Sequence, residues 1–382
     1  MNIQVPNNKQ NMALILILTI TFIAIAGCAG ETVGQSHGAV YKTDSNGSIE
    51  WVSSLDTGMR DQGYAIFETS DRGYLVAGFI SDNPKGVPGH QVFPRVVRLD
   101  RTGRTLWDTV LNTSYGTYDF KDAGSANAIA ETPDKHVIAT TSQGYVLLLD
   151  SSGNVEQVKR VENKSGDVFI SEKDMNILFL SENVSKYNSS GGLMWENPVD
   201  GYRRAFQTMD GGYCLGSLLD TKNGTRDGIS CINANGSTRW NYKGKGLGDE
   251  QITSFYEPSP GLIEVTYLRE DRTRTERLSD HPALTRLVTF DRNGKIIAEK
   301  NITASKPLIR TIDGGYVFTS GYFGSGKEYA SNVYTSPLHI ARFSQNGLLL
   351  WDQVLINSTS GENYPVSLIQ TKDGGFAVLV IS

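Results

Sequence analysis

The chain has 382 residues, of which 39% are apolar and 20% charged, a balance that is typical of folded proteins and argues against a disordered one. Its formal net charge is −5 and its Lys and Arg residues form no basic stripe, which argues against a nucleic-acid partner. Because this length exceeds what one ordinary hydrophobic core serves, it favours a fold in which repeated units pack on their neighbours.

Residues 1–27 have the pattern of a signal peptide. A polar start precedes an apolar run over Met12–Gly27, which is shorter than the about 20 residues that a membrane-spanning helix needs. The run ends in Ile25-Ala26-Gly27-Cys28, which resembles the lipobox of lipoproteins and implies a lipid on the Cys28 thiol. Simple secretion stays open, because Ala24-Ile25-Ala26 also fits a cleavage site. We therefore expect an exported protein at the cell surface or envelope, with residues 28–38 as the lipidated tether of a membrane anchor.

A first motif recurs seven times in residues 39–382. It is a turn that opens with Asp, Asn or Ser and closes with Gly three residues later, and the clearest copies have Trp four residues after that Gly. The five tryptophans of the chain all occupy this position, namely Trp51, Trp107, Trp195, Trp240 and Trp351. Two degenerate copies, Asp150–Gly153 and Asp291–Gly294, are followed by Gln157 and Ala298 instead.

A second motif, Thr-x-Asp-Gly-Gly-Tyr, alternates with the first. Its copies begin at Thr69, Thr132, Glu172, Thr208, Glu257, Thr311 and Thr371, the second, third and fifth being weak. In both motifs Asp or Asn caps its own backbone and Gly supplies the positive φ that follows, so both are tight turns. Runs of alternating or apolar β-formers, such as Tyr74–Gly78 and Arg95–Leu99, flank them.

These motifs predict an all-β fold, a seven-bladed β-propeller of four-stranded antiparallel blades over residues 39–382. Each repeat holds strands A to D, with the second motif between A and B and the first between C and D. The region begins with a C-like segment (Ala39–Thr43) and a D strand (Ser48–Leu55), and it ends with an A and a B strand. We therefore expect the N- and C-terminal strands to share one blade and close the ring. An open β-solenoid or two sandwiches are the structural alternatives.

The stretch Leu99–Trp107 resembles the Trp-docking repeat of quinoprotein-like propellers, and the second motif resembles turns of secreted β-propeller repeat proteins at microbial surfaces. The resemblance covers residues 39–382 and implies that Trp51, Trp107, Trp195, Trp240 and Trp351 pack between neighbouring blades as structural residues. It does not extend to redox chemistry, because quinoprotein dehydrogenases usually have eight blades and an adjacent Cys pair that this chain lacks. We expect no cofactor.

Other candidate sites are few. Cys214 and Cys231 can face each other across a hairpin, so a disulfide and a pair of buried thiols both stay open. The five histidines show no metal-ligand spacing, and we expect no metal site. The N-x-S/T pattern permits glycosylation without requiring it at nine asparagines: Asn46, Asn112, Asn163, Asn183, Asn188, Asn223, Asn235, Asn301 and Asn357.

The long segments all lie in connections from B to C or from D to A, which open on the same face of an up-and-down blade. They are Ile80–Pro94, Asn112–Ser125, Arg269–Ala283, Gly324–Pro337 and Ile356–Tyr364. We expect a ligand-binding surface there, because function concentrates on loops held by a rigid scaffold. Its candidate contacts are His90, Tyr115, Tyr118, Asp119, Phe120, Tyr329 and Tyr334. Ordinary packing of these aromatics on the blades beneath is the alternative.

The sequence thus favours a non-enzymatic surface lipoprotein whose propeller binds a protein or glycan. It contains no catalytic constellation, so we do not favour an enzyme. Two alternatives stay open. One is an enzyme with its site at the central channel mouth, a lyase, a glycoside hydrolase or an atypical quinoprotein. The other is an envelope assembly scaffold, similar to the propeller lipoproteins of outer-membrane insertion machinery.

Overall fold

The computed structural model describes residues 37–381 apart from a set of connecting segments. Residues outside the description are 1–36, 82–90, 113–115, 117, 119, 121–122, 162–166, 172, 181–182, 199–201, 218–227, 245–249, 270–283, 304–307, 321–337, 358–362 and 382. The predicted signal peptide, Cys28 and almost all of the predicted tether therefore lie outside the described residues. In the part of the chain that is described, no helix has the length and apolarity that a membrane crossing requires.

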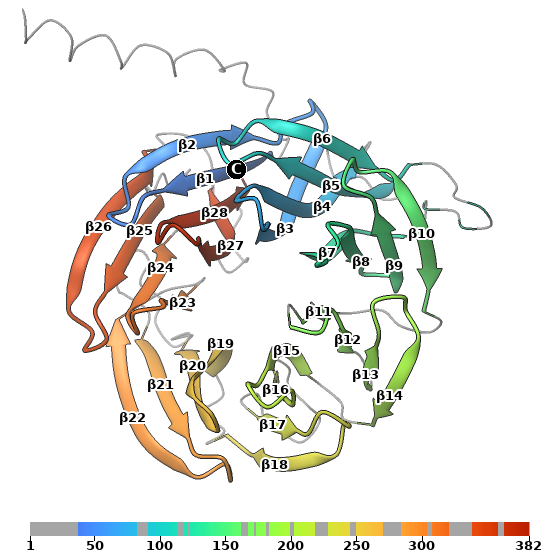
Figure 1. The fold of residues 1–382 in the computed structure, drawn as a ribbon. Helices are drawn as coiled ribbons and strands as arrows, with labels where there is room; N and C mark the ends of the chain where they lie inside the picture. The colour runs from blue at the N-terminus through green and yellow to red at the C-terminus, as the bar shows by residue number, and fades with distance from the viewer. Residues whose placement is uncertain are drawn as a thin grey trace, which may run out of the picture. The chain divides into compact units, whose positions relative to one another are not determined.

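Residues 37–381 form seven four-stranded antiparallel sheets, which stand as blades around a ring (Figure 1). Blade I consists of β27 (Tyr364–Gln370), β28 (Phe376–Ile381), β1 (Gly38–Thr43) and β2 (Ile49–Ser54). Blade II consists of β3 (Arg60–Glu68), β4 (Tyr74–Ser81), β5 (Val92–Leu99) and β6 (Thr105–Val110). Blade III consists of β7 (Ala126–Glu131), β8 (Val137–Thr141), β9 (Tyr145–Leu149) and β10 (Val155–Arg160).

The other four blades repeat this order. Blade IV consists of β11 (Asp167–Ile170), β12 (Ile177–Leu180), β13 (Val184–Tyr187) and β14 (Leu193–Asn197). Blade V consists of β15 (Tyr202–Gln207), β16 (Tyr213–Ser217), β17 (Ile229–Ile232) and β18 (Thr238–Tyr242). Blade VI consists of β19 (Glu250–Ser259), β20 (Leu262–Arg269), β21 (Leu284–Phe290) and β22 (Ile296–Thr303). Blade VII consists of β23 (Leu308–Arg310), β24 (Tyr316–Ser320), β25 (Leu338–Phe343) and β26 (Leu349–Ile356).

The two ends of the chain meet in blade I. Strand β1 pairs antiparallel with β28 from Gly38↔Ile381 to Thr43↔Phe376, and with β2 on its other side. Inner strands of each blade contact those of the next all the way round, including β27 and β28 of blade I with β3 of blade II. The prediction of a seven-bladed ring closed by a shared blade is therefore confirmed.

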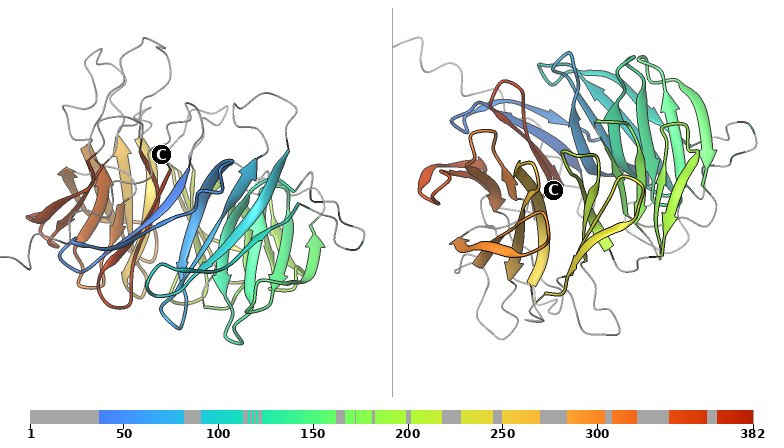
Figure 2. Two further views of the ribbon diagram at one scale, coloured as in Figure 1. Left: turned by 90° about the horizontal axis from the view of Figure 1, so that it is seen from above. Right: turned by 60° about the horizontal axis from the view of Figure 1, so that its bottom comes forward.

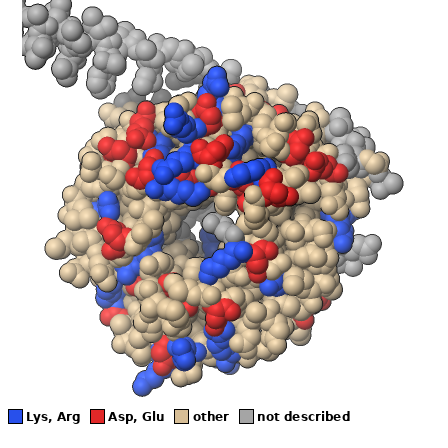
Figure 3. All heavy atoms as spheres, in the orientation of Figure 1, with Lys and Arg blue, Asp and Glu red and all other residues tan. Residues whose placement is uncertain are grey.

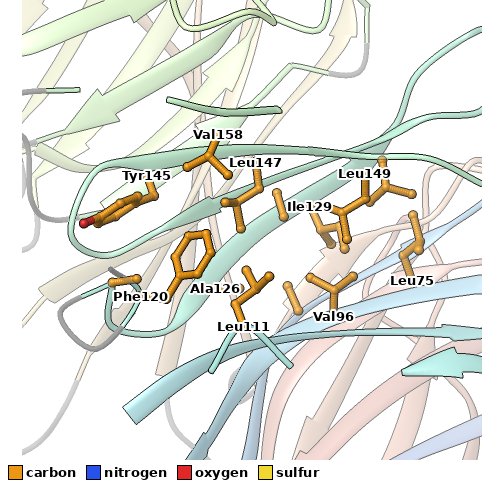
Figure 4. Close-up of a cluster of buried hydrophobic side chains, with 14 residues drawn as sticks. Leu75, Val96, Leu111, Phe120, Ala126, Ile129, Tyr145, Leu147, Leu149 and Val158 are labelled. Carbon is orange, nitrogen blue, oxygen red and sulfur yellow. The ribbon is translucent and has the colours of Figure 1, made fainter. Parts of the chain in front are cut away.

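The hydrophobic core lies between the blades rather than at the centre of the ring. Every residue of β4 is buried, because both faces of a second strand are covered by neighbouring blades, whereas β2 on the rim is mostly exposed. Figure 4 shows one such layer, in which Leu75 and Val96 of blade II meet Ile129 and Leu147 of blade III. The number of apolar β-formers that a strand needs is therefore larger in the covered second strands than in the strands on the rim.

The antiparallel order of each blade separates two faces (Figure 2). The A–B and C–D connections are short and lie together on one face, which we call the turn face. The B–C and D–A connections lie together on the opposite face, which we call the loop face. The face seen in Figures 1 and 3 is the turn face.

The A–B turns keep one backbone shape even where the motif is degenerate. Gly211, Gly314 and Gly374 have φ between 81° and 85° after the turn aspartate. Arg72 and Lys135 stand at the same place with φ of 66° and 71°, a region that costs a non-glycine residue about 1 kcal/mol. The rest of the blade therefore enforces the turn against a local preference.

Candidate functional site

In the five blades whose D strand has a tryptophan, that tryptophan lies on the glycine of the next C–D turn. A Cβ atom built on Gly103 would lie only 2.5 Å from the ring of Trp51, and the Trp51 Nε1–H donates to the carbonyl of Arg101 at 3.1 Å. Glycine is therefore needed at position 103 for two reasons: its φ is positive, at 82°, and the absence of a side chain leaves room for the indole. The contact joins blade I to blade II.

The same contact recurs at four other blade boundaries. Trp107 lies on Gly153, Trp195 on Gly236, Trp240 on Gly294 and Trp351 on Gly47. The carbonyls of Ser151, Ala234 and Ser45 accept the indole N–H of Trp107, Trp195 and Trp351 at 2.9, 2.9 and 3.2 Å. The geometry agrees with the resemblance to Trp-docking propellers.

Blades III and VI, which lack the tryptophan, use a lysine two residues further along the D strand. The side chain of Lys159 lies 2.8 Å from where a Cβ of Gly191 would stand. The ammonium group of Lys300 donates to the carbonyl of Gln345 at 2.9 Å. Each of these lysines therefore reaches the next C–D turn in place of the indole.

A cation faces the tryptophan from strand C in four blades, and it is buried in three of them and half-buried at Arg342. The register pairs are Lys42↔Trp51, Arg98↔Trp107, Lys186↔Trp195 and Arg342↔Trp351. Each cation forms an ion pair with the aspartate of the A–B turn in its own blade, at Asp373 (3.1 Å), Asp71 (2.6 Å), Asp174 (3.5 Å) and Asp313 (2.5 Å). These pairs, which we call the turn clasps, connect strand C to the A–B turn.

The turn clasps were not predicted from the sequence, although a signal was present. The cation stands two residues before the opening residue of the first motif, as in Arg98-Leu99-Asp100. Charged side chains of both signs accordingly gather around the central opening of the turn face (Figure 3).

Blade V replaces the cation by a cysteine. Cys231 is the register partner of Trp240 and forms a disulfide with Cys214 on the neighbouring strand. Both cysteines are buried, with exposed fractions of 0% and 1%. Arg239 of the D strand pairs with Asp210 at 2.8 Å, so the A–B turn of this blade keeps an ion pair from a different position.

A second set of contacts links the A–B turns of blades I, II and V to the next blade. The backbone N–H of Ser70 donates to the Glu131 carboxylate at 2.7 Å, and that of Lys372 donates to Glu68 at 2.7 Å. The N–H of Met209 likewise donates to Glu257. Since the acceptor in each pair lies on or beside strand A of the neighbouring blade, these hydrogen bonds join blade I to blade II, blade II to blade III and blade V to blade VI.

The aspartates of the A–B turns are held ionised by this arrangement. Partial burial would raise the pKa of Asp71, but hydrogen bonds from Thr69, Arg98 and the Gly73 N–H outweigh it and lower the pKa from 3.8 to about 2. The pKa is also lowered at the five equivalent aspartates, Asp134, Asp174, Asp210, Asp313 and Asp373.

We therefore expect an acid transition. Carboxylates of the unfolded chain take up protons near pH 4, before the folded turns do, so stability that is fully present above pH 4 falls as the pH drops from about 4 to about 2. Asp71→Asn should flatten this loss, because it removes one of the contributing carboxylates. The test is the urea midpoint at a series of pH values between 2 and 6. Parallel curves for wild type and variant would contradict the assignment.

The described candidates for a loop-face binding surface are Tyr118 and Phe120. Phe120 is only 2% exposed and packs in the layer between blades II and III, with its ring 5.8 Å from that of Tyr145. Phe120 therefore offers no surface to a ligand. The expectation that it contacts a ligand is corrected: it packs on the blades beneath, which was the alternative. Tyr118 is half-buried and meets Tyr145 edge-to-face at 6.1 Å. The other candidates, His90, Tyr115, Asp119, Tyr329 and Tyr334, lie outside the described residues.

Two buried carboxylates have raised pKa values. Burial raises the pKa of Asp61 against hydrogen bonds from Thr57 and the charge of Arg95, whose guanidinium lies 2.9 Å away. Burial likewise raises the pKa of Glu264 against the charge of Arg310, which lies 3.2 Å away. The hollow lined by Asp61 and Arg95 encloses about 10 Å³, room for about one water molecule.

His37, Asp56 and Asp61 lie close enough together to offer three ligand atoms to a metal ion. His37 Nδ1 lies 3.0 Å from Asp56, and Asp61 is already paired with the cationic Arg95. These side chains lie where blades I and II meet.

No family model matches the chain, and no curated protein matches it. Among solved structures it is similar to the crystal structure of BamB from Moraxella catarrhalis, with 13% identity, a TM-score of 0.42, and coverage of 89% of this chain and 90% of that one.

Proposed function

We propose that the protein is a non-enzymatic scaffold whose ring presents a variable loop face to a protein or glycan partner. The observation that carries the proposal is the contrast between the two faces. The turn face repeats the same hydrogen bonds and ion pairs from blade to blade. The loop face does not repeat, because its B–C connections range from 142–144 in blade III to 321–337 in blade VII.

A rigid ring with a variable face suits recognition. Docked tryptophans at five boundaries, and lysines at the other two, fix each blade to the next. The strand ends that carry the loops therefore keep their spacing when the loop sequences differ. The buried acids Asp61 and Glu264 lie in ion pairs with arginines, which favours a structural role for them over proton transfer to a substrate.

Binding is tested by placing a photo-crosslinking residue on either face of the full chain in its native cells. We expect crosslinked partner from Tyr334, in the longest loop-face connection, and none from Ile312, which is 82% exposed on the turn face. A second crosslinking residue is placed at His90, in another loop-face connection. Replacing 321–337 by the short blade III connection 142–144 should abolish the crosslink from His90. Crosslinks from Ile312 alone would overturn the proposal, as would crosslinks at His90 that persist unchanged.

We also propose that the protein is exported and held at the envelope by a lipid on Cys28, which lies outside the described residues. Support comes from the disulfide between Cys214 and Cys231, since disulfides form and persist in oxidising compartments. Cys28→Ala should move the protein from the membrane fraction to the soluble exported fraction and end its labelling by a fatty-acid analogue. A protein that stays unlabelled and soluble with Cys28 intact would favour simple secretion instead.

A further inference from the structure

The described asparagines of the N-x-S/T pattern all lie toward the rim of the ring. Asn46, Asn188 and Asn235 are in C–D turns. Asn301 is on β22, Asn112 and Asn357 follow the D strands β6 and β26, and Asn183 precedes β13. Among the described residues, strands A and B therefore carry none of them.

Exposure separates these asparagines into two groups. Asn183 is half-buried and its amide donates to Glu196 at 2.8 Å. The other six are exposed, namely Asn46, Asn112, Asn188, Asn235, Asn301 and Asn357. An exposed amide on the rim can be reached by an enzyme that acts on the folded protein.

Two of the exposed sites show how the serine of the pattern contacts its asparagine. The amide oxygen of Asn235 accepts from the Ser237 hydroxyl at 2.7 Å and from the Ser237 N–H at 3.1 Å. The amide oxygen of Asn188 accepts from the Ser190 hydroxyl at 2.8 Å. In both sites the hydroxyl binds the amide oxygen, so the local backbone already brings together the two groups that define the pattern.

We propose that the exposed rim asparagines, Asn46 and Asn235 first among them, carry N-linked glycans in the native cell. The inference rests on the proposed export, because the donor is a lipid-linked oligosaccharide phosphate on the far side of the membrane. A bond forms between the sugar C1 and the asparagine Nδ2, and the bond from C1 to the donor phosphate oxygen breaks. The amide nitrogen loses one proton, and the lipid phosphate leaves.

Glycans at these places would protect the open edges of the blades. Each D strand has one unpaired edge, and exposed edges invite pairing with another chain. Strand β26 is the most apolar of these edges, with Leu349, Leu350 and Val354 exposed by 56%, 53% and 45%. A glycan on Asn357, at the end of β26, would hinder edge-to-edge association of two copies.

The chain contains its own matched controls. Asn46, Asn235, Asn293 and Asn346 all stand in C–D turns directly before a glycine with φ between 79° and 85°. The first two have Ser two residues later, whereas Asn293 and Asn346 have Lys295 and Leu348 there. All four are exposed, so the position, the following glycine and the turn are held constant while the pattern changes.

The test is glycopeptide mass spectrometry on full-length protein purified from its native cells. We expect glycan on Asn46 and Asn235 and none on Asn293 and Asn346, whereas spontaneous deamidation would affect all four. Ser237→Ala should remove the glycan from Asn235 alone, and Ser237→Thr should keep it. Unmodified Asn46 and Asn235, or glycan that persists in Ser237→Ala, would overturn the proposal. Failure here is distinguishable from failure of the proposed function, because the loop-face crosslink does not depend on rim glycans.

Discussion

Replacing Trp240 by alanine is expected to lower the free energy of unfolding by about 3–5 kcal/mol, the usual cost of truncating a buried tryptophan. Trp240 is only 8% exposed, stacks on Phe290 with ring centroids 5.6 Å apart, and lies on Gly294 of the next blade. Its removal would leave a cavity between blades V and VI that the rigid β-sheets cannot close. Urea denaturation followed by circular dichroism measures the change.

Two further variants test whether the loss of stability comes from the buried indole or from any substitution on a D strand. Trp240→Phe keeps an aromatic ring against Phe290 and should lose less stability than the alanine variant. Leu350→Ala, at a D-strand position that is 53% exposed, should stay within about 0.5 kcal/mol of wild type. A Trp240→Ala protein with the wild-type midpoint would show that the indole does not hold the two blades together.

Replacing Leu379 by aspartate is expected to prevent the ring from closing. Leu379 is fully buried in β28, where it stands between Val40 of β1 and Ser367 of β27. Its methyl groups also approach Gly63 of blade II so closely that a Cβ there would lie 2.8 Å away. An unpaired buried carboxylate costs several kcal/mol, a large share of the about 5–15 kcal/mol that stabilises a typical protein.

Limited proteolysis and sedimentation measure the outcome for Leu379→Asp, which should be protease-sensitive and prone to aggregate. Leu379→Met conserves volume and should cost less than about 1.5 kcal/mol, so it reports whether the charge or merely the altered shape is responsible. A Leu379→Asp protein that unfolds cooperatively at the wild-type midpoint would mean that the shared blade is dispensable for closure.

The fold could be predicted because its signals are local. Tight turns need particular residues at fixed offsets, so two recurring turn motifs were enough to count seven blades and to assign the chain ends to one of them. Even the degenerate turns at Arg72 and Lys135 kept their shape, because the surrounding strands outweigh about 1 kcal/mol of local strain.

The turn clasps and the fate of Phe120 depend on contacts distant in the sequence, and this is why they were missed. Lys42 and Asp373 are 331 residues apart and become neighbours only when the ring closes. Phe120 lies in a long connection that was expected to face a ligand, but an aromatic ring beside an apolar blade gains more by burial. Loop length therefore indicated a candidate face without indicating which aromatics remain exposed on it.

The shared blade also has a consequence for timing. Strand β1 is among the first parts of the propeller to be made, and one of its two hydrogen-bonding partners, β28, is the last. Until the whole chain has emerged, β1 retains an unsatisfied edge, and the loop that must then close is about as long as the domain itself. During this interval the unpaired edge of β1 is open to association with other chains.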